Sequence, residues 1–305
     1  MGKHSDIPGD PGRPQGCAPT IHEDHKPTHR AVYGRGAPLR SPWSIMLLCL
    51  LFLSTACDVP SIGGPPTPAA SDVPGNPQLN TWYSASRGVE VRYEDWKTDG
   101  GDEDTVTIVR FDLHAVTLSV GYKPAQPLVM SQWMQQERAT AIINGGFFDQ
   151  NDRATALVVS NGQAFGETYT GFGGMLSVDA QGRIRLRSLR QQPYNANEQL
   201  SQAIQSSPTL VLDGKRTQFN ADTSQNRRSI VAMDRQGRML FIASPDQVFT
   251  LNQLADLLTS SDLSIDIALN LDGGSSTGLY VNGGSQHVAI DSYVRLPLVV
   301  IVKAR

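Results

Sequence analysis

Cysteine is absent from the chain after Cys57, and histidine is scarce there. All three cysteines and four of the six histidines lie in the first 57 of the 305 residues, which leaves only His114 and His287 for the rest. This excludes disulfides, thiol nucleophiles, cysteine-ligated metals and histidine-rich zinc sites from the main part of the chain. A two-metal phosphoesterase is also disfavoured, because such sites usually recruit several histidines. We expect His114 in a strand and His287 near a turn, both in structural or exposed positions.

Basic charge and long apolar runs are also lacking. The net charge is −3 and the isoelectric point is near 6.1, so no global basic field predicts a nucleic-acid partner. Only one segment is apolar enough to meet a membrane, which excludes a polytopic membrane protein. The hydrophobic share of 39% is too high for a disordered chain and is typical of a globular protein.

The one apolar segment is typical of a secretion signal. Residues Trp43–Ala56 (WSIMLLCLLFLSTA) follow two arginines and are too short to span a bilayer comfortably. The segment ends in Leu53-Ser-Thr-Ala-Cys57, which resembles the lipobox of bacterial lipoproteins, where the cysteine is acylated. We therefore expect secretion across the cytoplasmic membrane and a lipid anchor on Cys57 in the cell envelope or periplasm. A plain signal peptide cleaved near Ala56 is the alternative.

Composition divides the chain into three parts. Residues 1–57 form an N-terminal extension and the signal peptide. Residues 58–80 are rich in proline and glycine, with six prolines between Asp58 and Leu79, and are expected to form a flexible tether. Residues 81–305 are expected to form the functional domain.

Short alternating runs in residues 81–305 predict many strands and few helices. Asp179-Ala-Gln-Gly182 and Asp234-Arg-Gln-Gly237 each predict a hairpin turn between two strands. Thr250–Ser260 is predicted to be a helix with a capping box from Thr250 and Gln253, and Ser131–Ala139 and Glu198–Ser206 are weaker helix candidates. The fold class is therefore α+β, with β-dominated mixed sheets and a few flanking helices. The expected strands are Val116–Tyr122, Arg183–Arg187 with an outer face of arginines, Leu210–Leu212, Ile230–Met233, Met239–Ala243, Ile265–Leu271, Leu279–Val281 and Leu296–Val302, with Pro297 at a strand start or on an edge.

Two glycine-rich segments follow expected strands. The first is Ile143-Asn-Gly-Gly-Phe-Phe-Asp149, and the second is Leu271-Asp-Gly-Gly-Ser-Ser-Thr277. Paired glycines make tight turns, and they also let backbone N–H groups approach an anion. Neither segment has the spacing of a dinucleotide fingerprint, a phosphate-binding loop or a nucleophile elbow. For either segment alone, a simple turn is the more common explanation.

Two adjacent arginines, Arg227 and Arg228, stand immediately before another expected strand. Exposed arginines are commonly just solvated. An arginine fixed at a strand end, however, offers a fork that suits phosphate or carboxylate.

Taken in order, these motifs resemble the phosphodiester glycosidase family. The resemblance rests on Ile143–Asp149, Gln205-Ser-Ser-Pro-Thr-Leu-Val211, Arg228-Ser-Ile-Val231 and Ala268–Thr277, and it extends over roughly Arg87 to Val302. It implies a hydrolase that cleaves a sugar-1-phosphodiester or a related glycosidic bond. Asp272 would be the carboxylate at the anomeric centre, and Asn144 and Asp149 would position sugar hydroxyls or share acid–base work. Arg228 would hold the phosphate, in a pocket lined by Gly145, Gly146, Gly273, Gly274, Ser275, Ser276 and Thr277.

The chemistry of such a site fits this composition. A carboxylate stabilises an oxocarbenium-like transition state, and a phosphate monoester with a second pKa of about 6 leaves readily, so histidine is not required. No cofactor is indicated. A divalent cation on Asp272 or Asp149 is an alternative, although the sequence does not have the spacing of a calcium-binding loop. The expected partners are a carbohydrate or sugar-phosphate substrate and the membrane that holds the anchor. The alternative is a non-catalytic envelope module that binds glycan or a phosphate-containing polymer through the same pocket.

Overall fold

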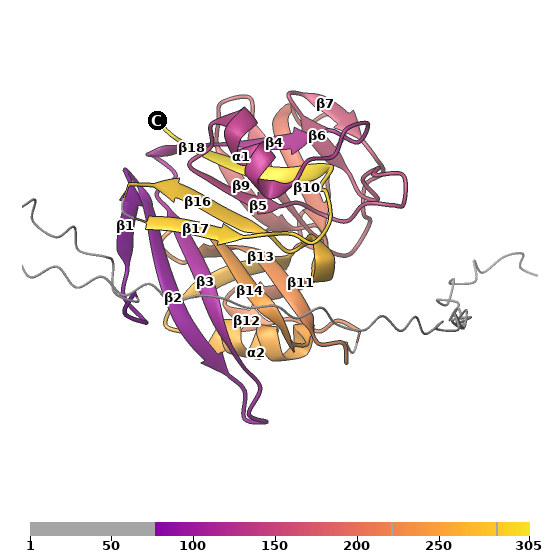
Figure 1. Ribbon diagram of the computed structural model, residues 1–305. Coiled ribbons are helices and arrows are strands. Elements are labelled where there is room, and N and C mark those ends of the chain that lie inside the picture. The colour runs from indigo at the N-terminus through magenta and orange to yellow at the C-terminus, as the bar shows by residue number, and fades with distance from the viewer. Residues whose placement is uncertain (1–76, 221, 285) are drawn as a thin grey trace, which may run out of the picture. The chain divides into compact units, whose positions relative to one another are not determined.

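The computed structural model describes residues 77–220, 222–284 and 286–305. Cys57, the expected signal and nearly all of the expected tether lie outside these residues. In the described part, strands far outnumber helices, and the strands form three antiparallel sheets (Figure 1). The expected dominance of strands is therefore confirmed, with two α-helices in the described residues.

The largest sheet has eight strands in the order β1-β2-β3-β14-β13-β15-β11-β12. Strand β13 is antiparallel to β15, and so is β11, so the starts of β13 and β11 lie at the end of β15. The site is built at this end of the sheet. The strands are β1 (Tyr83–Ser86), β2 (Val89–Lys97), β3 (Glu103–Phe111), β11 (Thr209–Leu212), β12 (Lys215–Arg216), β13 (Asn226–Asp234), β14 (Met239–Phe249) and β15 (Ile265–Asn270).

Two five-stranded sheets complete the fold, in the orders β7-β6-β10-β8-β9 and β17-β16-β5-β18-β4. The first contains β6 (Val158–Ser160), β7 (Gln163–Phe165), β8 (Gly174–Asp179), β9 (Ile184–Ser188) and β10 (Leu200–Ser206). The second contains β4 (Val116–Tyr122), β5 (Ala141–Asn144), β16 (Leu279–Gly283), β17 (Gln286–Ile290) and β18 (Leu298–Ala304).

All three sheets contribute side chains to one hydrophobic core. Val231 from the large sheet, Leu176 from the β8 sheet and Ile143 from the β5 sheet are all fully buried in it. A shared core of this kind ties the strand ends of different sheets to fixed positions, because close-packed interiors transmit small displacements.

The two helices cover further apolar surface. Helix α2 (Leu251–Ser260) begins with the expected capping box, in which Thr250 Oγ1 accepts from Gln253 N at 3.2 Å and Gln253 Oε1 accepts from Thr250 N at 2.8 Å. It packs Leu254 and Leu258 on the large sheet. Helix α1 (Met130–Glu137) agrees with the weaker candidate over Ser131–Ala139.

The third helix candidate, Glu198–Ser206, is wrong, because Leu200–Ser206 forms strand β10 between β6 and β8. Its buried glutamines are satisfied by distant groups: Gln202 Oε1 accepts from Val120 N at 2.9 Å, and Gln205 Oε1 accepts from Tyr169 N at 2.7 Å. These tertiary hydrogen bonds allow polar residues inside a central strand, where a sequence pattern favours an exposed helix face.

The remaining local predictions have mixed outcomes. The turns at Asp179–Gly182 and Asp234–Gly237 join β8 to β9 and β13 to β14, and Pro297 directly precedes β18. The arginine face of β9 is only partly exposed, because Arg187 is buried and binds Glu198 at 2.6 Å. His114 lies in the turn before β4 and not in a strand, and like His287 on β17 it is exposed.

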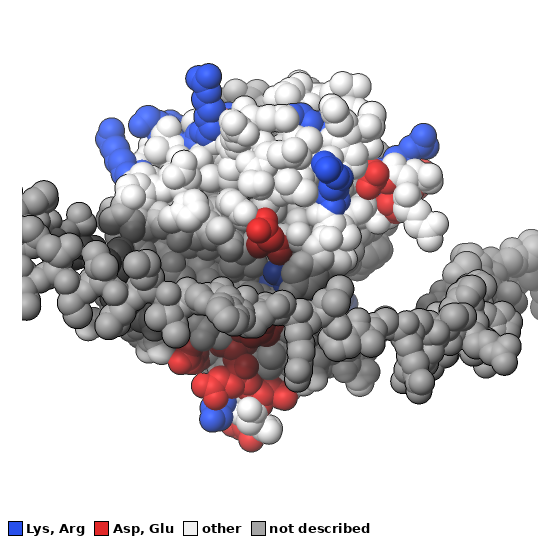
Figure 2. Space-filling model, viewed as in Figure 1, with Lys and Arg blue, Asp and Glu red and all other residues white. Residues whose placement is uncertain are grey.

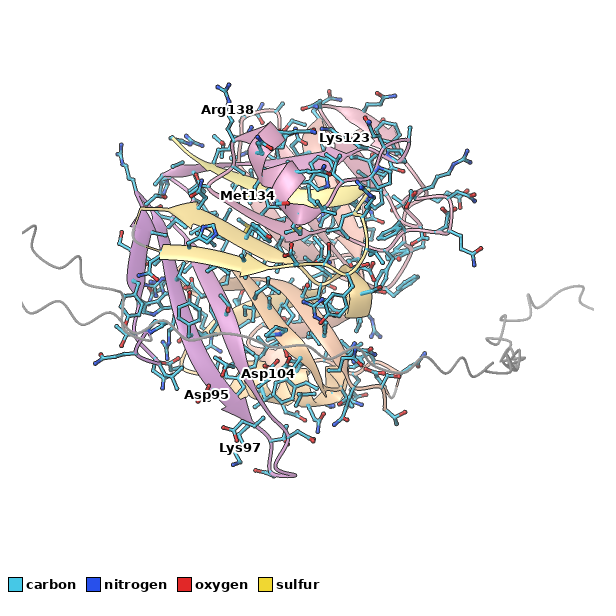
Figure 3. All side chains as sticks on the ribbon, in the orientation of Figure 1. Asp95, Lys97, Asp104, Lys123, Met134 and Arg138 are labelled. Carbon is cyan, nitrogen blue, oxygen red and sulfur yellow. The ribbon has the colours of Figure 1, made fainter. Side chains whose placement is uncertain are left out.

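Charge is unevenly spread over the face shown in Figure 2, with Lys and Arg toward its upper part and Asp and Glu around the lower tip. Figure 3 labels Asp95 and Lys97 near that tip, where β2 turns into β3, and Lys123 and Arg138 at the other end. The tip would therefore repel an anionic ligand. Among the described residues, no helix is long and apolar enough to cross a membrane.

Candidate active site

The two glycine-rich segments lie in contact, as the sequence predicts, although they follow strands in different sheets. Asn144 is the last residue of β5, and Asp272 comes two residues after the end of β15. Asp272 donates its backbone N–H to Gly145 O at 3.1 Å, and Asn144 Nδ2 donates to Asp272 O at 2.7 Å. The start of β13 completes the junction, because Ser229 O accepts from Leu271 N at 2.8 Å.

Asn144 is fully buried, and hydrogen bonds occupy its side chain. Its Oδ1 accepts from Ser229 Oγ at 2.6 Å and from Gly278 N at 3.1 Å, while Nδ2 donates to Asp272 O. The expectation that Asn144 touches a sugar hydroxyl does not fit this geometry. The geometry makes Asn144 a positioning residue that holds three strands together.

Asp272 has the carboxylate environment that the proposed chemistry needs. Its Oδ1 accepts from Gly273 N at 3.0 Å, and the Ser276 hydroxyl is also hydrogen-bonded to it. Burial raises the pKa of Asp272 above its ordinary value, and these two hydrogen bonds only partly offset the effect. A carboxylate perturbed by desolvation at a loop junction is a candidate for catalysis.

Glycine is required in both segments by close backbone approach. A Cβ on Gly146 would lie 2.6 Å from Gln205 O, and a Cβ on Gly273 would lie 2.8 Å from Arg227 O. A Cβ on a third glycine, Gly145, would lie 2.5 Å from the Leu298 side chain. Close packing is therefore enough to explain why these positions are glycine. The groups that approach them belong to β10, β13 and β18, so these strands also reach the junction.

The second segment continues as a short 3₁₀ turn over Gly274–Ser276. Ser275 is exposed at its surface, whereas Ser276 and Thr277 are buried. Thr277 Oγ1 has no hydrogen-bond partner within the described residues. Since Gly273 N is committed to Asp272, a phosphate at this turn would meet Ser275 and Gly274 before Gly273.

Arg228 lies beside this turn, but its guanidinium is occupied. Nη2 binds Asp222 Oδ2 at 2.8 Å and also Ser224 O, and Nε donates to Phe249 O at 3.0 Å. The residue is 6% exposed, and burial lowers its pKa despite the neighbouring carboxylate. The phosphate-holding role expected for Arg228 is therefore at odds with its contacts, which tie β13 to the loop before it and to the start of α2.

The neighbouring Arg227, the other arginine of the pair noted in the sequence, makes different contacts. Arg227 donates to Pro245 O and to Asp291 O, and its guanidinium stacks 4.1 Å from the Tyr293 ring centroid. Its Nη1 is buried without a partner in the described part of the chain.

Asp149 is exposed, and its carboxylate closes a turn. Oδ1 accepts from Asn151 N at 2.8 Å and from Arg153 N at 2.9 Å. The hydrogen bond from Arg153 is the main reason that the pKa of Asp149 is lowered. These contacts give Asp149 a structural role in its loop, in contrast to the acid–base role expected from the sequence.

The described residues contain no cluster of three or more His, Cys, Asp or Glu side chains suited to a metal ion. At the junction of β5, β13 and β15, the carboxylate of Asp272 is desolvated and accepts a hydrogen bond from the Gly273 amide. This arrangement can stabilise positive charge that develops on a bound ligand.

Comparisons with known proteins give a family and similar folds. The phosphodiester glycosidase family model matches residues 137–298, more than half of the chain. The fold is similar to the zebrafish N-acetylglucosamine-1-phosphodiester alpha-N-acetylglucosaminidase catalytic domain auto-inhibited by its pro-peptide, with a TM-score of 0.56 and 18% identity over 75% of this chain and 87% of that chain. A hypothetical protein from Synechocystis is also similar, with a TM-score of 0.52 and 17% identity over 72% of this chain and 63% of the other. The comparison with curated proteins gives no match.

Proposed function

The chain belongs to the phosphodiester glycosidase family, and we propose that it is a hydrolase of a sugar-1-phosphodiester or a related glycosidic bond. The observation that carries the proposal is the position of Asp272. Its carboxylate is desolvated, and its backbone is held by Asn144 and Gly145 at the junction of the two glycine-rich segments.

In the proposed reaction, the bond between the anomeric carbon and the phosphate oxygen breaks. Water adds to the carbon and loses one proton to the solvent, and the phosphate monoester leaves with the bonding electron pair. Asp272 would face the anomeric carbon, where a carboxylate in a site of low dielectric strongly stabilises an oxocarbenium-like charge. The leaving phosphate has a second pKa of about 6, so a strong general acid is not needed.

The phosphate would lie over the turn at Gly274–Ser276, with the exposed Ser275 hydroxyl as its first contact. Arg227 is better placed than Arg228 to add positive charge there. Tyr293, which stacks on the Arg227 guanidinium, is joined to this turn through the hydrogen bond from Tyr293 N to Ser275 O at 2.7 Å.

The testing experiment is a hydrolysis screen of the full-length chain on sugar-1-phosphodiesters, with both products identified by mass. The name of the zebrafish relative makes an N-acetylglucosamine-1-phosphodiester the first substrate to try. Asp272→Asn keeps the side-chain shape and removes the charge, so it should lower turnover by orders of magnitude. Asp149→Asn is the matched control, since its carboxylate serves a turn.

Two results would count against this function. One is the absence of hydrolysis across the panel while the folded protein still binds the same diesters, which would favour a glycan- or phosphate-binding module. The other is parental turnover in Asp272→Asn.

We also propose, from the sequence around Cys57, that the enzyme is held in the cell envelope by a lipid anchor on that cysteine.

A further inference from the structure

The loop after β17, residues 291–296, links the candidate site to helix α1. At one point of the loop, Tyr293 N donates to Ser275 O at 2.7 Å, which fixes the loop to the turn where the phosphate is proposed to lie. At its end, Leu296 O accepts from Trp133 Nε1 at 2.9 Å, and Trp133 is a fully buried residue of α1. The loop therefore holds α1 in a fixed position beside the site.

Three cations stand in line along an exposed stripe of α1. Gln132 and Gln136 are exposed and four residues apart, so their side chains share one face of the helix, about 6 Å apart along its axis. Arg295 Nη1 donates to Gln132 Oε1 at 3.4 Å, and Lys123 Nζ donates to Gln136 Oε1 at 2.7 Å. Arg138 is exposed at the C-cap of the helix. We call Arg295, Lys123 and Arg138 the α1 row.

The positive charge of the α1 row is only partly balanced. Arg138 and Arg295 form no ion pair within the residues that the structure describes. The single acidic residue of α1, Glu137, is shared by two lysines, with Lys123 Nζ at 3.9 Å and Lys303 Nζ at 3.5 Å from its carboxylate. The chain as a whole carries a net charge of −3, so this surface has the opposite sign and attracts anions.

The figures show the same separation of charge. Figure 3 labels Lys123, Arg138 and Met134 of α1 at one end of the molecule and Asp95 at the opposite end. In Figure 2, Lys and Arg lie toward the upper part of the same face, and Asp and Glu surround the lower tip. A long anionic ligand would therefore be drawn along α1 and away from the tip.

The shape of the α1 row favours an extended chain as its ligand. Tyr293 and Arg295 are separated by roughly 7 Å of extended backbone, and the eight residues of α1 add about 12 Å. The amides of Gln132 and Gln136 lie between the cations, where they can bind hydroxyl groups between successive phosphates. A bilayer surface is favoured by apolar side chains beside the basic ones, and the exposed residues of α1 are all polar.

We propose that the α1 row is an exosite for a polyanionic chain, so that the substrate is a polymer with repeating phosphodiesters. The inference rests on the proposed function and deepens it, because it names the substrate class. The diester that is cleaved would lie at Asp272 and the Gly274–Ser276 turn, and the phosphates that follow it along the polymer would bind Arg295 and then Lys123.

Binding is measured with two probes that contain no glycosidic bond, by calorimetric titration of the full-length chain. Long-chain inorganic polyphosphate can span the α1 row, and tripolyphosphate has the same chemistry but is too short. The test variant is Lys123→Gln/Arg295→Gln. The matched control is Lys97→Gln/Arg235→Gln, because Lys97 is also an exposed lysine beside one glutamate, and Arg235 is exposed in the turn at the other end of β13 from the site.

The test variant should bind polyphosphate about tenfold more weakly than the parent, since each exposed ion pair contributes a few-fold. Its affinity should also fall less steeply with salt, by roughly one unit of log–log slope for each charge removed. The control variant should bind like the parent, and tripolyphosphate should not distinguish the two variants. The charge-conserving Lys123→Arg/Arg295→Lys should restore the parental affinity. Urea midpoints of all variants confirm that the fold is intact.

Hydrolysis is compared on a tetramer of N-acetylglucosamine units joined by 1→6 phosphodiesters and on the methyl diester of N-acetylglucosamine 1-phosphate. The methyl diester reaches only the reacting centre, whereas the tetramer can also reach the α1 row. The Michaelis constant for the tetramer, divided by that for the methyl diester, should rise about tenfold in the test variant and stay constant in the control variant.

The proposal is overturned if the test variant binds polyphosphate within twofold of the control variant. It is also overturned if the test variant loses affinity only for phosphatidylglycerol vesicles, which would make α1 a membrane-facing surface. Polyphosphate binding that depends on the α1 row, without hydrolysis of either diester, would refute the proposed function and leave the row as a binding surface. Hydrolysis with the same ratio of Michaelis constants in both variants would keep the function and refute the exosite.

Discussion

The side-chain amide of Asn144 donates to the backbone carbonyl of Asp272 at 2.7 Å, and this hydrogen bond joins segments 128 positions apart in the chain. The carbonyl belongs to the residue whose carboxylate is proposed to act, so Asn144 fixes the backbone from which that carboxylate projects. Asn144 Oδ1 is in turn held by Ser229 Oγ and Gly278 N. The position of Asp272 thus depends on three strands from two sheets.

Replacement of Asn144 by alanine should destabilise the fold by about 2–4 kcal/mol, because several buried donors and acceptors lose their partner at once. The measurement is urea unfolding of the parent and the variant, and the matched control is Asn282→Ala on an exposed position of β16. Activity should fall as well, through displacement of Asp272. An Asn144→Ala protein as stable as the Asn282→Ala control would contradict this reading of the junction.

Arg228→Gln should lower stability rather than selectively raise the Michaelis constant. Its guanidinium binds Asp222, Ser224 O and Phe249 O, so its removal leaves buried acceptors unpaired. If Arg228 instead holds the phosphate, the variant should keep the parent's urea midpoint and show a raised Michaelis constant. Measuring both quantities on one preparation separates the two roles.

Arg228→Gln should also change how much folding stability is lost at acid pH. Burial raises the pKa of Asp222, but hydrogen bonds from the Leu251 and Ser224 amides and the charge of Arg228 together hold it below the ordinary value. A lowered folded-state pKa adds stability above the unfolded-state pKa, and this is lost as the pH falls through the folded-state pKa. The parent should therefore lose more stability on acidification than Arg228→Gln, as measured by unfolding at pH 7 and below pH 4.

Local sequence signals were enough for several parts of this site. The strand–Gly-Gly pattern identified both segments because a buried strand that ends in paired glycines has a recognisable local composition. The capping box of α2 was equally readable, since Thr250 and Gln253 satisfy each other's backbone groups within one turn. The contact between the two segments was inferred from their similar sequences, each an apolar strand followed by Asn or Asp and two glycines, and from the family resemblance.

The direction of single side chains was not readable in the same way. Arg227 and Arg228 are adjacent, and the direction of each side chain depends on the register of β13 against β14, which shifts between Asn226 and Arg228. A one-residue change in register reverses every side chain of a strand. The role of β10 was missed for a similar reason, because Gln202 finds its partners on distant strands.

Asp149→Asn should retain most of the parental activity. An asparagine oxygen can still accept from Asn151 N and Arg153 N, as Asx turns tolerate either residue. The expected change in kcat/KM is less than about threefold, well below the effect of removing a catalytic group. A loss of a hundredfold or more, with the fold intact, would restore Asp149 to the reacting centre.

The anchor prediction rests on Cys57 and can be tested without knowledge of the substrate. In a bacterial host, the full-length chain should incorporate labelled fatty acid and sediment with membranes, and Cys57→Ser should lose the label and leave the membrane fraction. An unlabelled parent whose membrane association does not change in Cys57→Ser would rule out the lipoprotein interpretation.

Asp272→Asn should leave the fold as stable as the parent, or more stable, at neutral pH while it abolishes turnover. Burial raises the pKa of Asp272 above its unfolded-state value, so between those two values the folded protein binds more protons than the unfolded chain. Stability from this group is therefore greatest below the unfolded-state pKa and falls as the pH rises through the folded-state pKa. The asparagine carries no charge and should remove that decline, so variant and parent should differ most at neutral pH and converge near pH 4. Urea midpoints at several pH values measure this difference. A variant that is less stable than the parent at pH 7 would contradict the prediction, because it would show that the contacts of the carboxylate with Gly273 and Ser276 stabilise the fold by more than its desolvation destabilises it.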